Sequence, residues 1–306
     1  MSDVYAKNLQ RDVEESQRLD EQFDLLTENL GYLIHPEVLE SLTAQNASTN
    51  PPTPFRIADL ATGTARFLRQ VAASPPDPLL AHALLDGSDL SVALFPTPQE
   101  EQPSPSPSRI TLHQHDIRAP IPSEWEARYD LVHVRQVAAG LAPEDWIPVV
   151  SNLARLLKPG GAMQWEECNF SNVVHLRGGS VAECTVAAAR RLGQLFQHGL
   201  RDHFAHGWDR LETAMRAAGL QQVDGERVSA DRVPATRRAL TANGMAVIRR
   251  WAAAKARAGE LREIRSGELV SLEEVEALGV QAEKDIASGC YVRFDIHAAW
   301  GFRPVE

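Results

Sequence analysis

Apolar and polar positions alternate between strand-like and helical periods across residues 55–165. Short apolar runs that end at glycine or acidic residues predict strands, and the segments between them carry apolar residues at helical spacing. The predicted strands are 55–60, 81–85, 110–115, 129–134 and 162–165. Strands that alternate with helices in this way are typical of βαβ units, so the pattern predicts a parallel sheet with right-handed crossovers.

Helical periodicity dominates both flanks of this core. Residues 12–30 repeat apolar positions at helical spacing and meet a stop signal at Gly31, and a second helix follows Pro36. In the later part of the chain, the pattern predicts helices over 178–219, 236–258 and 271–288. It predicts strands over 220–228 and 291–296. The polar run 46–54 predicts a linker, and the proline-rich run 96–108 predicts a surface loop.

Composition narrows the class of protein. Hydrophobic residues make up 43% and charged residues 24% of the 306 positions, which is typical of a globular protein. The net charge of −10 argues against nucleic acid or an anionic membrane surface as a partner. Neither an 18-residue apolar stretch nor an apolar signal region is visible, so we expect a cytoplasmic protein.

The cysteines predict neither a disulfide framework nor a metal site. Cys168, Cys184 and Cys290 are odd in number, far apart and without a CxxC spacing. We therefore expect buried thiols in a reducing compartment, and we expect no bound metal.

Acidic residues stand where three predicted strands end. Asp59 belongs to a Gly/Thr turn after the first strand, Asp89 follows the second, and Asp116 follows the third. An acid after the second strand can accept hydrogen bonds from ribose hydroxyls, in dinucleotide sites as well as in S-adenosylmethionine (SAM) sites. A dinucleotide needs a glycine-rich turn for its pyrophosphate, whereas this turn has only Gly63. The three carboxylates at the strand ends together favour a cationic adenosyl ligand over a ligand with a pyrophosphate.

Five successive motifs resemble those of the class I SAM-dependent methyltransferases. They are IADLATGTA at 57–65, LLDGSDLS at 84–91, TLHQHDI at 111–117, YDLVHVR at 129–135 and LLKPGGAMQW at 156–165. More narrowly, they are similar to small-molecule methyltransferases of fungal secondary metabolism, including gliotoxin-type thiomethyltransferases and relatives of the LaeA regulator. Residues 11–36 resemble the helical cap of that subgroup.

The resemblance implies SAM as the cofactor and assigns contacts to it. It implies that Asp59, Ala61 and Gly63 hold the methionine part of SAM. Asp89 and Leu90 would contact the ribose and adenine, and Asp116 and Ile117 the edge of the adenine. Val134 would line the site of the amino group. The family's turn has glycine where this chain has Ala61 and Ala65. An alanine there is costly wherever its φ is positive.

Candidate residues for the acceptor lie at the fifth strand and in two candidate lids. Alternation directs Trp165 and Glu167 to one face and Glu166 to the other. We expect Trp165 and Glu167 to face the substrate, and His133 to be a satisfied core histidine. The lid candidates are Tyr5, Gln22 and Tyr32 near the N-terminus, with Tyr32 expected at the substrate, and Met245 and Trp251 later in the chain. No residue is assigned as a catalytic base.

The resemblance implies an α/β fold with a Rossmann-like, seven-stranded, mostly parallel sheet in the order 3-2-1-4-5-7-6, its last strand antiparallel. We expect one methyltransferase domain over 1–306, divided into a helical cap 1–45, a core 52–230 and 289–306, and a helical insert 231–288. The expected function is methyl transfer from SAM to a thiol, hydroxyl or amine of a small molecule in secondary metabolism. The alternatives are a SAM-retaining pericyclase or lyase and a LaeA-like regulatory binding protein. The sequence leaves the oligomeric state open.

Overall fold

The computed structural model describes residues 11–48, 53–73, 78–96, 109–180, 182–204 and 208–305. Tyr5 lies outside them, as do the proline-rich loop beyond Pro96 and positions 49–52 of the predicted linker.

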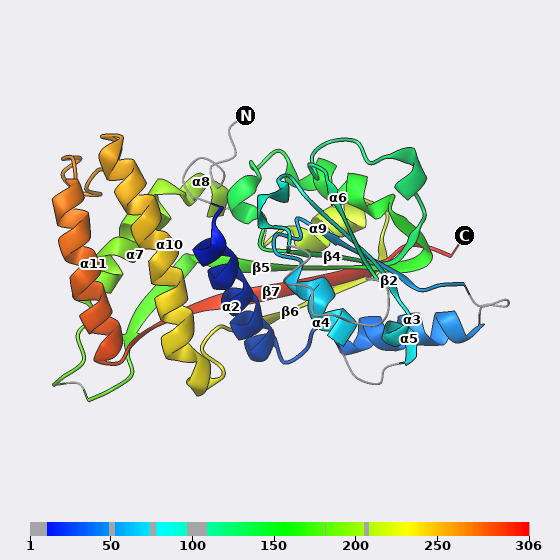
Figure 1. Ribbon diagram of the computed structural model, residues 1–306, viewed down its shortest axis with the longest axis horizontal. Coiled ribbons are helices and arrows are strands. Elements are labelled where there is room, and N and C mark those ends of the chain that lie inside the picture. Colours follow the sequence, from blue (N-terminus) through cyan, green and yellow to red (C-terminus); the bar gives the residue numbers. More distant parts are fainter. Residues whose placement is uncertain are drawn as a thin grey trace.

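A seven-stranded sheet forms the centre of the molecule (Figure 1). Its strands are β1 Arg56–Leu60, β2 Leu84–Asp89, β3 Ile110–Gln114, β4 Tyr129–Arg135, β5 Leu157–Arg177, β6 Gln221–Ser229 and β7 Cys290–Phe302. Their order is β3-β2-β1-β4-β5-β7-β6, and β7 runs antiparallel to both of its neighbours. The predicted fold class, strand order and orientation are confirmed.

Three strands differ from the prediction by more than one residue at an end. β2 begins at Leu84 because residues 78–81 form a helical turn, α5 Pro78–Ala81. β5 continues to Arg177, and β7 likewise exceeds its predicted span. After an irregularity between Asn169 and Val174, β5 pairs again with the start of β7. Glu166 and Glu167, which directly follow the predicted strand, are buried within β5.

Helices cover both faces of the sheet (Figure 1). On one face, α6 Trp146–Ala154 and α9 Leu211–Ala217 share a core with β1, β4 and β5. On the other, α3 Pro36–Ser48, α4 Arg66–Ala73 and α5 share a core with β1 and β2. Period-two alternation of apolar residues in the strands supplies both cores.

A second group of helices packs at the far end of β5 and β7 (Figure 1). It comprises α7 Ala187–Gly199, α8 Arg201–Phe204, α10 Arg237–Arg257 and α11 Leu272–Ala287. The helical part at this end therefore draws on residues before β6 as well as on the predicted insert. All three cysteines are buried and free, and Cys184 and Cys290 belong to this core.

Helix α2 Val13–Leu30 is capped at both ends, and its end at Gly31 is the one that the sequence predicts. The Asp12 side chain accepts a hydrogen bond from the Glu15 amide, and Gly31 ends the helix at φ +92°. α2 crosses between the two helical groups (Figure 1). That position sets it over the carboxyl ends of the central strands.

Candidate active site

The turn after β1 has an alternating left-handed backbone. Ala61, Gly63 and Ala65 have φ values of 57°, 54° and 57°. These are the positions at which the resembled family has glycine. The two alanines therefore occupy the costlier conformation, with a strain of about 1 kcal/mol each. The turn keeps the glycine-type geometry although two glycines are missing.

Three carboxylates from adjacent strand ends line one cavity. Asp59 is the last residue but one of β1, Asp89 ends β2 and Asp116 follows β3, and all three line a cavity whose whole volume is about 340 Å³. Four more of the predicted cofactor residues line it, namely Ala61, Gly63, Leu90 and Ile117. We call this end of the cavity the carboxylate crevice.

Backbone amides hold the Asp89 carboxylate in place. Its two oxygens accept hydrogen bonds from the amides of Gly63 and Ser91, each at 3.0 Å. Burial raises the pKa of Asp89 above its usual value in spite of these donors. A carboxylate has about four acceptor sites, so Asp89 retains capacity for further donors.

Asp116 forms an ion pair at the outer rim of the crevice. Both of its oxygens accept from the Arg118 guanidinium, at 2.7 to 3.1 Å. These hydrogen bonds lower the pKa of Asp116. Its neighbour Ile117 is buried against the sheet.

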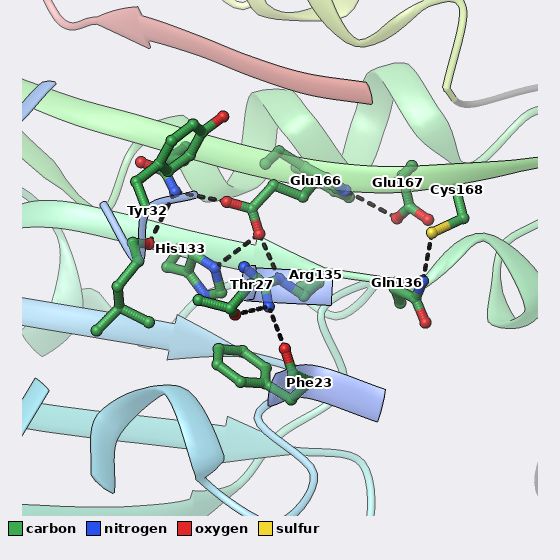
Figure 2. A network of polar contacts seen from close by, with 12 residues as sticks. Phe23, Thr27, Tyr32, His133, Arg135, Gln136, Glu166, Glu167 and Cys168 are labelled. Atoms are coloured by element: carbon green, nitrogen blue, oxygen red, sulfur yellow. Dashed lines mark hydrogen bonds and ion pairs between the residues drawn. The ribbon is translucent and has the colours of Figure 1, made fainter. Parts of the chain in front are cut away.

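A buried network of charges connects β1, β4 and β5. His133 Nδ1 lies 2.7 Å from Asp59 Oδ1, and its Nε2 lies 3.2 Å from Glu166 Oε2. Arg135 also donates to Glu166, as Figure 2 shows. Burial alone would lower the pKa of His133, but the two carboxylates outweigh it and raise that pKa. His133 is thus a satisfied core histidine, as predicted, although its ring also lines the cavity.

The same network lowers the pKa of Glu166. Burial opposes ionisation, yet Arg135 and His133 outweigh it and hold the pKa of Glu166 at about 2. Gln164 donates a further hydrogen bond to it. Glu166 is therefore an ionised structural group whose acceptor sites are taken by its neighbours.

Glu167 lies on the opposite face of β5 and has a different environment. Trp165 Nε1 and the Val137 amide donate to its Oε1, both at 2.9 Å, and the Ala138 amide lies 3.4 Å from Oε2. Burial raises the pKa of Glu167 to about 7. Glu167 lines the cavity, and it shares its face with Trp165 as alternation predicts.

Three predicted site residues do not line this cavity. Val134 lies between His133 and Arg135, which face the cavity, so the pleat directs Val134 into the core beneath α6. Trp165 is fully buried against Trp146. Tyr32 follows the turn at the end of α2, and its hydroxyl donates to Glu226 at 2.6 Å instead.

Of the predicted lid residues, Gln22, Met245 and Trp251 do line the cavity. Arg135 also lines the cavity and was not predicted; its guanidinium lies 4.0 Å from the Phe23 ring centroid and donates to Thr27 (Figure 2). Its place two residues after His133, on the same face of β4, was the available signal.

α2 is held to both sides of the cavity. Asp20 and Asp24 pair with Arg69 and Arg66 of α4, next to the crevice. Toward α10, Glu15 pairs with the half-buried Arg250, and Arg18, which also pairs with Glu15 within α2, donates to the buried Asn243. Leu19, Phe23 and Leu26 of α2 face the cavity between these two sets.

Residues 57–161 match a known family, the methyltransferase domain. This match spans β1 to the start of β5, the part of the chain that forms the crevice. Residues 57–161 are a class I methyltransferase domain. SAM is the cofactor of this class, and hence of this domain.

Curated fungal methyltransferases resemble the chain over about half of its length. Methyltransferase grgD of Penicillium sp is 35% identical over 157 residues, which cover 50% of this chain and 49% of that protein. N-methyltransferase sirN of Leptosphaeria maculans is 36% identical over 156 residues, or 51% of this chain and 47% of that protein. The chain thus spans about half the length of these curated relatives.

The residues of the crevice fit SAM. The cofactor is a cationic nucleoside, and the crevice offers three carboxylates, a backbone turn without a Cβ at Gly63, and apolar contacts from Leu90 and Ile117. A Cβ at Gly63 would meet nothing within 4 Å, so the space beside the turn is open. Within the described ranges, no helix is long and apolar enough to span a membrane, and no cluster of His, Cys, Asp or Glu could hold a metal ion.

Proposed function

We propose that the protein transfers the methyl group of SAM to a nitrogen atom of a small molecule of secondary metabolism. The observation that carries this proposal is the convergence of Asp59, Asp89 and Asp116 on one cavity within the methyltransferase domain. Nitrogen is chosen over oxygen and sulfur because several relatives are named N-methyltransferases, among them sirN and gliN of Aspergillus fumigatus.

In this proposal, the residues of the crevice contact different parts of the cofactor. Asp89 accepts hydrogen bonds from the ribose hydroxyls. Leu90 and Ile117 contact the adenine. Asp116 accepts from the exocyclic amine, and its pairing with Arg118 keeps it ionised. Asp59 and the turn hold the methionine part. When bound, the cofactor supplies a methyl group on a positively charged sulfur.

Glu167 is the group that we assign to the acceptor's proton. It is buried, it faces the cavity, and three N–H groups fix its orientation. A pKa of about 7 lets a carboxylate accept a proton near neutral pH and release it afterwards. A nitrogen that loses its proton as it is methylated needs such a group.

In this proposal, α2 excludes water from the cavity. Its apolar residues Leu19, Phe23 and Leu26 cover the cavity, and the ion pairs on both sides hold the helix there. In methyl transfer the protein contributes mainly alignment and a dry site, because the sulfonium is already activated.

The test is formation of S-adenosylhomocysteine from SAM with panels of amines, thiols and phenols, followed by chromatography. We expect turnover with amines. Asp89→Ala should weaken SAM binding several-fold to a hundredfold in calorimetry, because charge-assisted hydrogen bonds are lost. Asp224→Ala, which removes an exposed carboxylate on β6, is the matched control.

Two outcomes would overturn the proposal. Conversion of a substrate without S-adenosylhomocysteine would mean that the protein retains SAM, as a pericyclase or lyase does. A stable complex with another macromolecule, without turnover of any acceptor, would favour a regulatory binding protein.

A further inference from the structure

A chain of aromatic rings lines the cavity beyond Glu167. Phe294, Phe170, Phe204, Phe196 and Trp251 follow one another with ring centroids 5.2 to 5.6 Å apart. They come from β7, β5, α8, α7 and α10, and all five line the cavity. We call this end of the cavity the aromatic chamber.

The aromatic chamber differs from the crevice in charge. Among the described residues that line it from α7, α8, α10, β7 and the part of β5 after Glu167, none is acidic or basic apart from His175. Two of its polar side chains are satisfied within the protein. Gln197 donates to the Phe170 carbonyl, and Thr241 donates to the Arg237 carbonyl while it accepts from the Val292 amide.

Two buried nitrogen atoms of the chamber lack a partner. His175 Nε2 and Trp251 Nε1 have no hydrogen-bond partner in the described part of the chain, although their residues are only 6% and 4% exposed. Buried polar atoms of this kind are rare, and a ligand that pairs with them removes the cost.

Glycines of α7 leave room for both of these rings. A Cβ at Gly193 would lie 2.4 Å from a ring carbon of His175, and one at Gly199 would lie 2.4 Å from a ring carbon of Trp251. The two glycines are about 9 Å apart along the helix. The unpaired nitrogens therefore belong to rings held on two sides of α7, and both rings border the same cavity.

We propose that the aromatic chamber binds an uncharged aromatic molecule with a carbonyl-type oxygen for Trp251 Nε1 and a second polar group for His175 Nε2. This proposal rests on the proposed function, because the molecule is the part of the methyl acceptor that lies away from the transferred methyl group. Burial lowers the pKa of His175 to about 4, so its imidazole is neutral near pH 7 and suits an uncharged ligand.

The sheet sets the length of that acceptor. Glu167 pairs with His297 and His175 with Val292, so the two backbone positions lie five residue steps apart along β7. This corresponds to about 17 Å along the sheet. An acceptor that reaches both residues has the length of several fused or linked rings.

Binding is tested without turnover, so that the result does not depend on methyl transfer. The probe is prodan, an uncharged naphthalene with a ketone, whose emission responds to polarity and hydrogen bonding. We expect saturable binding to the full chain, and weaker binding of the anionic anilinonaphthalene sulfonate. No saturable binding of prodan, or equal binding of the anion, would overturn the proposal.

Gly244 on α10 offers a way to fill the chamber. It lines the cavity, and a Cβ there would meet no atom within 4 Å. Gly244→Leu should abolish prodan binding while SAM affinity in calorimetry stays unchanged, and leucine favours the helix over glycine. Ala242→Leu, on the exposed side of α10, is the matched control and should bind prodan normally.

Trp251→Phe and His175→Leu test the two polar contacts. Trp251→Phe should weaken prodan about twofold to tenfold and shift its emission to the blue, because one hydrogen bond is lost. His175→Leu should weaken a second naphthalene ligand, 6-acetyl-2-naphthol, by a similar factor, since that ligand carries a hydroxyl as well as a ketone. Unchanged affinities in both variants would overturn the polar assignment. If the wild-type protein does not bind SAM, that result would instead refute the proposed function.

Discussion

The carboxylate crevice and the aromatic chamber are two ends of one cavity with opposite chemistry. Acids and arginines line the crevice, at strand ends that lie close together in the sequence. Aromatic rings line the chamber, from five elements spread over residues 170–294. The charged groups for the cofactor thus come from local motifs, whereas the shape of the proposed aromatic site depends on how distant helices pack.

α2 contacts both regions but is held to them differently. Toward α10, Arg18 donates to Asn243 in a buried contact and the Glu15 carboxylate is fully buried, whereas Asp24 and its partner Arg66 are 42% and 30% exposed. Buried pairs are costly to break and exposed ones are screened by water. We therefore expect α2 to open on the crevice side while it remains attached to α10.

The largest effect is expected for Glu15→Gln. It removes the charge that faces two buried or half-buried guanidinium groups, and it should lower the free energy of unfolding by about 3 kcal/mol. Asp24→Asn on the same helix should cost less than about 1 kcal/mol. Urea unfolding measures both, and equal costs would remove the asymmetry between the two sides of α2.

Glu167→Gln tests the proposed proton acceptor, which lies where the carboxylate crevice meets the aromatic chamber. If Glu167 takes the proton of the acceptor, kcat should fall about a hundredfold or more while SAM affinity is kept. The carboxylate must be ionised to act, so the wild-type rate should be lost as pH falls through about 7, the pKa that burial gives it. A Gln variant with full activity, or with the same pH profile, would exclude this role.

Ala61→Gly is expected to have the smallest effect, and the opposite sign. The left-handed backbone at this position strains alanine, so glycine should raise the free energy of unfolding by about 0.5 to 1 kcal/mol after its greater freedom in the unfolded chain is counted. Ala72→Gly in the following helix should instead lower it by about 1 kcal/mol. Thermal unfolding distinguishes the two signs.

The crevice was largely predictable from the sequence because each of its acids lies at or just beyond the carboxyl end of a strand. Strand ends in a parallel sheet share one edge, so Asp59, Asp89 and Asp116 had to meet. Val134 was assigned to the cavity on resemblance, but the pleat of β4 turns it into the core. Tyr32 was misplaced for a related reason, since the turn at Gly31 redirects the chain.

The chamber could not be predicted in the same way. His175 and Phe170 belong to the part of β5 beyond the predicted strand 162–165, and their partners on α7 and α10 are set by tertiary packing. Trp251 was named as a lid residue, but nothing in its sequence neighbourhood indicated an unpaired indole nitrogen. Helical spacing places such side chains on a face without telling what that face meets.

β5 extends through both regions as a single strand of 21 residues, paired with β7 on either side of its irregular segment. Backbone hydrogen bonds fix the separation between the two ends, and they do not stretch. In the proposed function, this fixed separation determines which lengths of acceptor fit the cavity. Molecules that are too short can fill one end of the cavity and still hold the wrong atom in front of the methyl donor.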